Sequence, residues 1–150
     1  MNNEKDNVYD LVEDFYAHDE GWNTLLRQEY AEGFLRMEAW KGKKNSDLYR
    51  SWDNLTMLCL YLGSAETFLG DMNADDFIDC IAWCGRNISE FTPDYKNTQD
   101  FLETCDGLFK YLKGKNAISN DTVPGTAAEI LLQEGKMNII LPDGSFDEAN

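Results

Sequence analysis

The sequence has little positive charge and no long apolar run, and each lack excludes a class of function. Lysine and arginine total 13 against 28 aspartates and glutamates, which gives a formal net charge of −15. Such a surface repels phosphate backbones and anionic lipid. Free nucleic acid and membranes are therefore poor partners, whereas a protein with a basic surface is compatible. No stretch approaches the roughly 18 apolar residues that a membrane-spanning helix needs.

The common catalytic and cofactor-binding motifs are also missing. The sequence contains no phosphate-binding loop, no Gly-x-Gly-x-x-Gly and no His-Glu-x-x-His. His18, the single histidine, lies in a polar stretch with no nearby serine or cysteine to complete a nucleophile–base set. The sequence therefore predicts a protein that is not an enzyme and has no cofactor.

The N-terminal segment and the cysteines suggest a reducing compartment. The first ten residues are polar and acidic, without the basic and apolar regions of a signal peptide, so we expect a cytoplasmic protein with reduced thiols. Four cysteines could form a thiolate set for zinc: Cys59, Cys80, Cys84 and Cys105. Structural zinc sites usually place cysteine pairs in tight loops, whereas these four fall inside predicted helices. The pattern favours burial in the core over metal binding and leaves open whether the four meet in space.

Helical periodicity is the strongest positive signal. Over residues 97–112 one apolar stripe follows a helical spacing: Phe101, Leu102, Cys105, Leu108, Phe109 and Leu112. This stripe predicts a helix from about Pro93 to Leu112, with Thr92 as its cap. Similar stripes predict helices beginning near Val8, Leu26, Ser46, Asn73 and Thr126.

These patterns predict an all-α protein, a single compact bundle of about five to six helices. The length of 150 residues suits one domain. The run LTMLCLYL is apolar on nearly every side, which places the helix over residues 48–62 at the centre of the bundle. We assign residues 1–135 to the helical domain. We assign residues 136–150 to an extended C-terminal tail, because MNIIL has strand-like residues and is followed by Pro-Asp-Gly.

The acidic segment after residue 70 partly matches a calcium-binding loop. Asp71, Asn73, Asp75 and Asp79 occupy positions 1, 3, 5 and 9 of the EF-hand pattern. The glycine of position 6 and the glutamate of position 12 are absent. Helix capping by Asn73 or Asp71 explains the same residues, so no metal site is predicted.

Four aromatic residues fall at helix ends or off the main apolar stripes: Trp22, Trp40, Trp83 and Tyr95. Exposed aromatic side chains act as anchors in protein interfaces, so these are the candidate interface residues. The alternative is that a six-helix bundle buries several faces of its helices and takes these rings into its core.

Residues 71–121 resemble a known helical module. The segment DMNADDFIDCIAW, a loop, and then NTQDFLETCDGLFKYLKGKNAISND resemble the core-binding (SAM-like) domain of tyrosine recombinases. The resemblance implies a small helical bundle that grips the DNA backbone, with Lys110, Lys113 and Lys115 within reach of phosphates. The flanking helices carry several carboxylates, which oppose such binding.

Two functions from different classes follow. The leading hypothesis is a non-enzymatic cytoplasmic protein that acts through protein–protein contact as a regulator or adaptor. The alternative is a nucleic-acid-related role, either as a degenerate recombinase-type module or as an acidic mimic of DNA that occupies a basic groove. A small-molecule site between helices is a third option.

Overall fold

The structure is a computed structural model that describes residues 7–134, and the predicted tail over residues 136–150 lies outside the described residues. The described chain contains six α-helices: α1 (Val8–His18), α2 (Gln28–Trp40), α3 (Asn45–Ala65), α4 (Ala74–Asn87), α5 (Tyr95–Gly114) and α6 (Val123–Gln133). Two short 3₁₀ turns, η2 (Glu20–Thr24) and η3 (Leu69–Asp71), join them. No strand occurs between residues 7 and 134, so the all-α prediction is confirmed.

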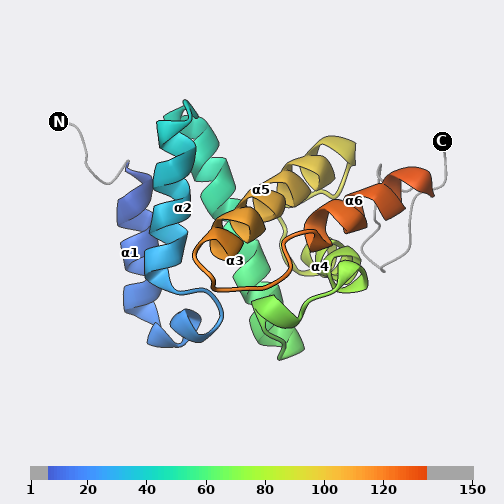
Figure 1. Cartoon of the computed structure of the whole chain (residues 1–150), viewed down its shortest axis with the longest axis horizontal. Helices are drawn as coiled ribbons and strands as arrows, with labels where there is room; N and C mark the ends of the chain where they lie inside the picture. The colour runs from blue at the N-terminus through green and yellow to red at the C-terminus, as the bar shows by residue number, and fades with distance from the viewer. Residues whose placement is uncertain (1–6, 135–150) are drawn as a thin grey trace.

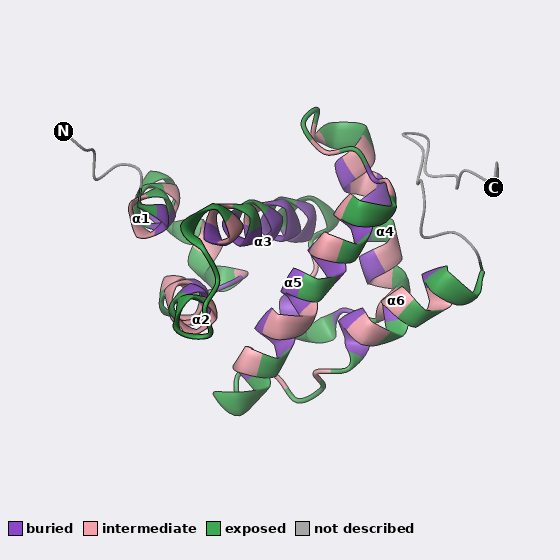
Figure 2. Cartoon of the chain, turned by 90° about the horizontal axis from the view of Figure 1, so that it is seen from above, coloured by how far each residue is buried: buried purple, intermediate pink, exposed green. Residues whose placement is uncertain are grey.

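The helices form two groups that share α3. In Figure 1, α1 and α2 stand side by side at one end, and α5 and α6 cross the other end with α4 beneath them. Helix α3 packs against α1, α2, α4 and α5, which confirms its predicted central place. Seen from above, it runs lengthwise from the α1–α2 pair toward α4 and α5 (Figure 2). Helix α6 packs on α4 and α5 and covers their outer side.

The apolar stripe of α5 lies entirely in the core. All six of its residues are buried: Phe101, Leu102, Cys105, Leu108, Phe109 and Leu112. Phe109 contacts Phe77 of α4 edge to face, with 5.4 Å between ring centroids. Helix α1 packs on α3 through aromatic side chains: Phe15 of α1 meets Trp52 of α3 edge to face. The long helices α3 and α5 thus join two packed groups into one domain.

Two predicted helix starts are wrong by a few residues. Helix α5 begins after Asp94, whose carboxylate accepts a hydrogen bond from the Asn97 backbone N–H, so Asp94 and not Thr92 is the N-cap. Helix α6 begins at Val123, three residues before the predicted start at Thr126. Pro124 stands in its first turn, where proline removes no helical hydrogen bond and its ring favours a helical φ.

The start and end of α3 also differ from the prediction. Ser46 is not its cap, because the helix already begins at Asn45 after a Lys44 N-cap that makes no side-chain hydrogen bond. At its other end the helix continues past Gly63 and stops at Glu66, which adopts a left-handed φ of 56°. Asparagine, aspartate or glycine would be usual at such a position, so glutamate gives no local signal there.

Candidate functional site

The two most exposed predicted interface aromatics lie on different helices. Trp40, the last residue of α2, is 90% exposed, and Tyr95, the first residue of α5, is 44% exposed. Trp40 is followed by a basic loop that contains Lys41, Lys43 and Lys44. No ring contact joins these two aromatics among the described residues.

The other two predicted interface aromatics are half-buried and packed on the core. Trp22 in η2 stacks on Phe15, with ring centroids 4.7 Å apart. Trp83 on α4 meets Tyr61 of α3 edge to face at 6.0 Å. Each of these rings therefore has an internal partner, and of the four candidates only Tyr95 lines one of the two hollows described below.

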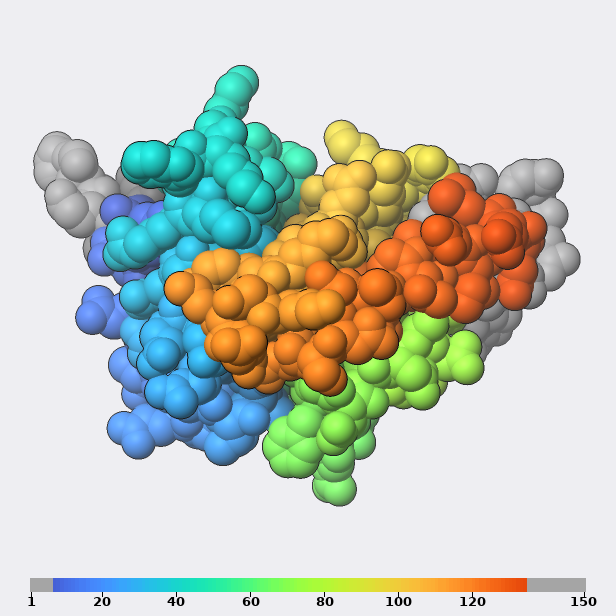
Figure 3. Space-filling model, in the orientation of Figure 1, coloured from blue at the N-terminus to red at the C-terminus, as the bar shows by residue number. Residues whose placement is uncertain are grey.

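A groove with a volume of about 270 Å³ lies along the contact between α5 and α6. Figure 3 shows the two helices next to each other on one face of the molecule, from gold through orange to red. Tyr95 and Leu132 line the groove, and Leu132 is 53% exposed. The other lining residues come from the same two helices: Gln99, Leu102, Glu103, Asp106, Pro124, Gly125 and Ala128.

Small residues on α6 keep the groove open. Gly125 and Ala128 face α5 one turn apart. A Cβ atom built on Gly125 would lie 3.8 Å from the Asp106 carboxylate, which is an ordinary contact, so the position accepts a side chain without a clash at Cβ. The sequence offered Tyr95 as a candidate, but Leu132 was missed, because only the packing of α6 on α5 brings it to the groove.

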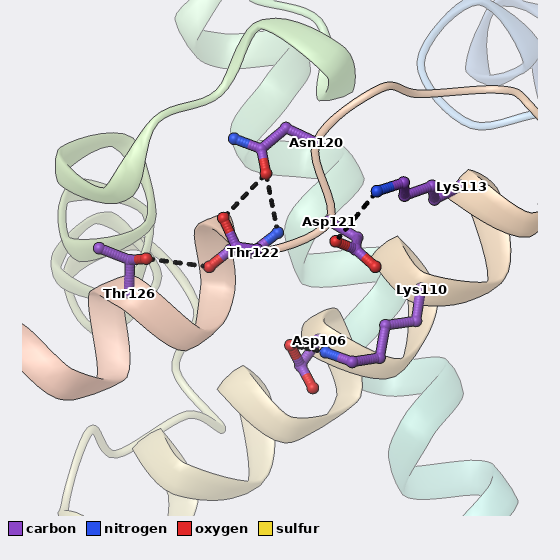
Figure 4. A network of polar contacts seen from close by, with 7 residues as sticks. All are labelled: Asp106, Lys110, Lys113, Asn120, Asp121, Thr122 and Thr126. Atoms are coloured by element: carbon purple, nitrogen blue, oxygen red, sulfur yellow. Dashed lines mark hydrogen bonds and ion pairs between the residues drawn. The ribbon is translucent and has the colours of Figure 1, made fainter.

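Carboxylates border the groove on its α5 side. Glu103 accepts a hydrogen bond from Gln99 at 3.2 Å, and Asp106 pairs with Lys110 at 2.7 Å (Figure 4). Each of the two pairs is spaced i,i+4 along α5, an arrangement that supports the helix weakly. The Asp106–Lys110 pair is largely exposed, so water screens it and both groups remain free to exchange partners.

The four cysteines lie in the interior, on α3, α4 and α5. All are free thiols and fully buried. Desolvation raises the pKa of Cys59 to about 12 and raises the pKa values of Cys80 and Cys105 well above the ordinary value. Cys80 is also close enough to Cys84 for a hydrogen bond between the thiols. The predicted burial of the four cysteines in the core is confirmed. Because a thiolate is the nucleophile and the metal ligand, the raised pKa values of Cys59, Cys80 and Cys105 disfavour the reactive form.

The remaining candidates from the sequence take structural positions. Asn73 and Asp76 form a capping box at the start of α4, in which each side chain accepts from the other residue's backbone N–H at 2.9 Å. His18 is exposed at the end of α1. Among residues 7–134, no group of three or more histidine, cysteine or acidic side chains is placed to hold a metal ion.

The three lysines singled out by the recombinase resemblance have partners within the chain. Lys110 pairs with Asp106, and Lys113 lies 3.9 Å from the Asp121 carboxylate (Figure 4). Lys115 stands 5.5 Å from the centroid of the Tyr111 ring. Phosphate binding by these lysines would compete with their internal contacts, and the resemblance stays a prediction.

No family model, curated protein or solved structure matches the chain. None of the described helices has both the length and the apolar character that crossing a bilayer requires.

Proposed function

We propose that this protein is a non-enzymatic binding protein, a regulator or an adaptor, whose α5–α6 groove takes a basic amphipathic segment of a protein partner. The observation that carries the proposal is the groove itself, in which exposed Tyr95 and Leu132 stand beside carboxylates. A cytoplasmic location fits the four free thiols.

The apolar part of the groove favours a partner with large aliphatic or aromatic side chains. Tyr95 and Leu132 each leave about half of their side-chain surface in water. Covering that surface is favourable by about 25 cal/mol per Å² of apolar area. The gap above Gly125 and Ala128 admits an inserted side chain, which is the usual form of an interface anchor.

The charged part of the groove favours a basic partner. Glu103 and Asp106 border it, and the chain as a whole carries a net charge of −15. A cationic segment would be steered toward this surface and would then replace Lys110 at Asp106. An acidic segment of the same apolar pattern would meet like charges. Charge therefore decides which amphipathic segments bind.

Titration with designed peptides tests the proposal. The probe is a synthetic helix-forming peptide with leucines at every third or fourth position and lysines between them, measured by calorimetry at about 0.15 M salt. A second peptide has the same composition in scrambled order, and a third carries glutamates in place of the lysines. We expect the first peptide to bind and the other two to bind at least about tenfold more weakly.

Variants locate the binding surface. Leu132→Ser and Tyr95→Ser should each weaken binding about tenfold or more, because truncating an interface anchor typically costs over 1 kcal/mol. Gly125→Leu should block the groove while keeping or raising the stability of α6, since leucine is a better helix former than glycine. Leu11→Ser is the matched control, because Leu11 is an exposed leucine on α1, which does not line the groove.

The pattern of these results decides between the groove and mere charge attraction. Equal binding of the ordered and scrambled peptides would show attraction to the acidic surface alone. Unchanged binding by Leu132→Ser, Tyr95→Ser and Gly125→Leu would place the interface elsewhere and end the proposal.

A further inference from the structure

A second hollow lies on another face of α5, where that helix meets α3 and the loop after α4. Its volume is about 440 Å³, within the range of about 300–1,000 Å³ that small-molecule sites occupy. Residues 97 and 100 of α5 line this cleft, whereas residues 95, 99, 103 and 106 line the α5–α6 groove. The spacing puts the two sets on different faces of the helix.

A buried asparagine at the cleft has an acceptor to spare. Asn54 of α3 is 4% exposed, and its Nδ2 donates to Asp100 Oδ2 at 3.0 Å and to Thr104 Oγ1 at 2.9 Å. The Thr104 hydroxyl in turn donates to the Asp100 carbonyl oxygen, so it can only accept from Asn54. Both amide hydrogens of Asn54 are therefore used. No described residue donates to its Oδ1.

Two carboxylates at the cleft also lack a partner. The Asn97 amide nitrogen donates to the Thr92 carbonyl at 2.8 Å, and the Thr56 hydroxyl donates to the Asp53 carbonyl at 2.7 Å. Neither the Asp53 nor the Glu90 carboxylate forms a hydrogen bond or ion pair with a described residue. The unpaired oxygens of Asn54, Asp53 and Glu90 therefore favour a ligand that brings donors to this site.

The cleft also has apolar walls. Met57, Leu60, Ile88 and Phe91 line it, and Leu60 is 39% exposed. Carboxylates and amide oxygens beside hydrocarbon walls match a ligand with a cationic end and an aliphatic chain. Arg50 is the one cation among the described residues that line the cleft, and it has no carboxylate within ion-pair distance. Three carboxylates line the cleft against this one cation: Asp53, Glu90 and Asp100.

We propose that this cleft binds an alkylammonium group, with the ammonium at Asn54 Oδ1 and the carboxylates of Asp53 and Asp100, and with the methylene chain against Leu60 and Phe91. The same chemistry is offered by a free aliphatic polyamine and by a lysine side chain of another protein. Partial burial raises the pKa of the Asp53 carboxyl above its ordinary value. Burial makes the ionised Asp53 carboxylate less favourable, and a bound cation would offset part of that effect.

Calorimetric titration of the full chain with spermidine tests the site at about 0.15 M salt, where diffuse attraction to an acidic surface is screened. We expect saturable binding with a stoichiometry of one. Asp53→Asn should weaken it about tenfold or more, because a hydrogen bond to a charged group is lost. Arg50→Gln should tighten it, because a competing positive charge leaves the cleft. A loss of affinity in Asp53→Asn together with a gain in Arg50→Gln is what a site for a cation predicts.

Glu13→Gln is the matched control for net charge. Glu13 is exposed on α1, so this substitution removes one negative charge at a position away from the cleft. Its affinity should stay within about twofold of the parent. An equal loss of affinity in Glu13→Gln and Asp53→Asn would show nonspecific attraction and overturn the proposal. So would a weaker affinity in Arg50→Gln.

A measurement on the unaltered protein avoids any effect of the substitutions on folding. The Asn54 side-chain amide signals in a ¹H–¹⁵N spectrum should shift on ligand addition, and those of Asn23, an exposed residue away from the cleft, should not. Parallel titrations with spermidine and with Nα-acetyl-lysine methylamide distinguish the two sources of the alkylammonium group. Shifts at Asn54 with either compound support the site, and none with both overturns it. The α5–α6 groove is not involved, so Asp53→Asn leaves the leucine–lysine peptide result unchanged.

Discussion

The two hollows beside α5 differ in what their side chains leave unsatisfied. In the α5–α6 groove the carboxylates already have partners on their own helix, and the unsatisfied surface is apolar, at Tyr95 and Leu132. In the α3–α5 cleft both amide hydrogens of Asn54 are used internally, and oxygen acceptors of Asn54 and Asp53 remain. The first hollow therefore suits a ligand that covers apolar surface, and the second suits a cation. One helix can thus support two kinds of recognition on two faces.

The largest expected effect concerns the buried thiols of the core. Burial raises the pKa of Cys59 from 9.0 to about 12, and it raises those of Cys80 and Cys105 as well. Between about pH 9 and pH 12 the unfolded chain loses thiol protons that the folded chain keeps. The free energy of unfolding therefore falls as pH rises above 9, and its full value is present below that pH.

Urea unfolding at about pH 8 and about pH 10.5 measures this loss. Cys59→Ala is the comparison variant, because it removes one of the raised pKa values and should show a smaller decrease between the two pH values. A midpoint that does not change with pH would show that the thiols are not desolvated. The contrast between a closed interior and two open hollows would then fail.

The next effect comes from loosening α5 itself. Phe109 is 1% exposed and packs against Phe77, so Phe109→Ala should lower the free energy of unfolding by about 3–5 kcal/mol through lost burial and a new cavity. Both hollows should be impaired together. Leu132→Ala, at a half-exposed position, should cost under about 1 kcal/mol in the same denaturation experiment and should affect the groove alone. An equal decrease in the free energy of unfolding in Phe109→Ala and Leu132→Ala would contradict the assignment of Phe109 to the core.

A smaller effect should separate the cleft from the groove. Asn54→Ala leaves Asp100 and Thr104 without their donor in a buried setting, at a cost of about 1–3 kcal/mol. We expect the variant to lose spermidine binding and to keep the leucine–lysine peptide affinity. Thermal unfolding and the two titrations measure these outcomes. Loss of both ligands together would show that the hollows are not independent.

The smallest effect is expected at Trp40. This side chain is 90% exposed, so Trp40→Ala should change the free energy of unfolding by less than about 0.5 kcal/mol. Because three lysines follow it, a basic peptide should avoid this end of α2 and bind the variant as it binds the parent. A clear loss of peptide affinity would move the interface from the α5–α6 groove to Trp40.

Helix existence and buried faces were predictable because they depend on local periodicity. The six-residue stripe of α5 and the central place of α3 follow from apolar spacing along each helix. Helix starts were less predictable, as Thr92 and Ser46 show, because several neighbouring polar residues can cap and only the final backbone conformation selects one. Of the groove residues, Tyr95 could be named because it falls outside the apolar stripe of its helix. Nothing in the sequence distinguished Leu132 from a buried leucine of a short helix.

The sequence by itself determined which face of each helix avoids water, because a period of 3.6 residues places side chains three and four apart on one side. Only the tertiary structure decided which faces meet. It brought Leu132 opposite Tyr95 and set Asn54 beside Asp100, 46 positions away along the chain. Such pairings depend on how whole helices pack, and the spacing within one helix carries no information about its neighbour.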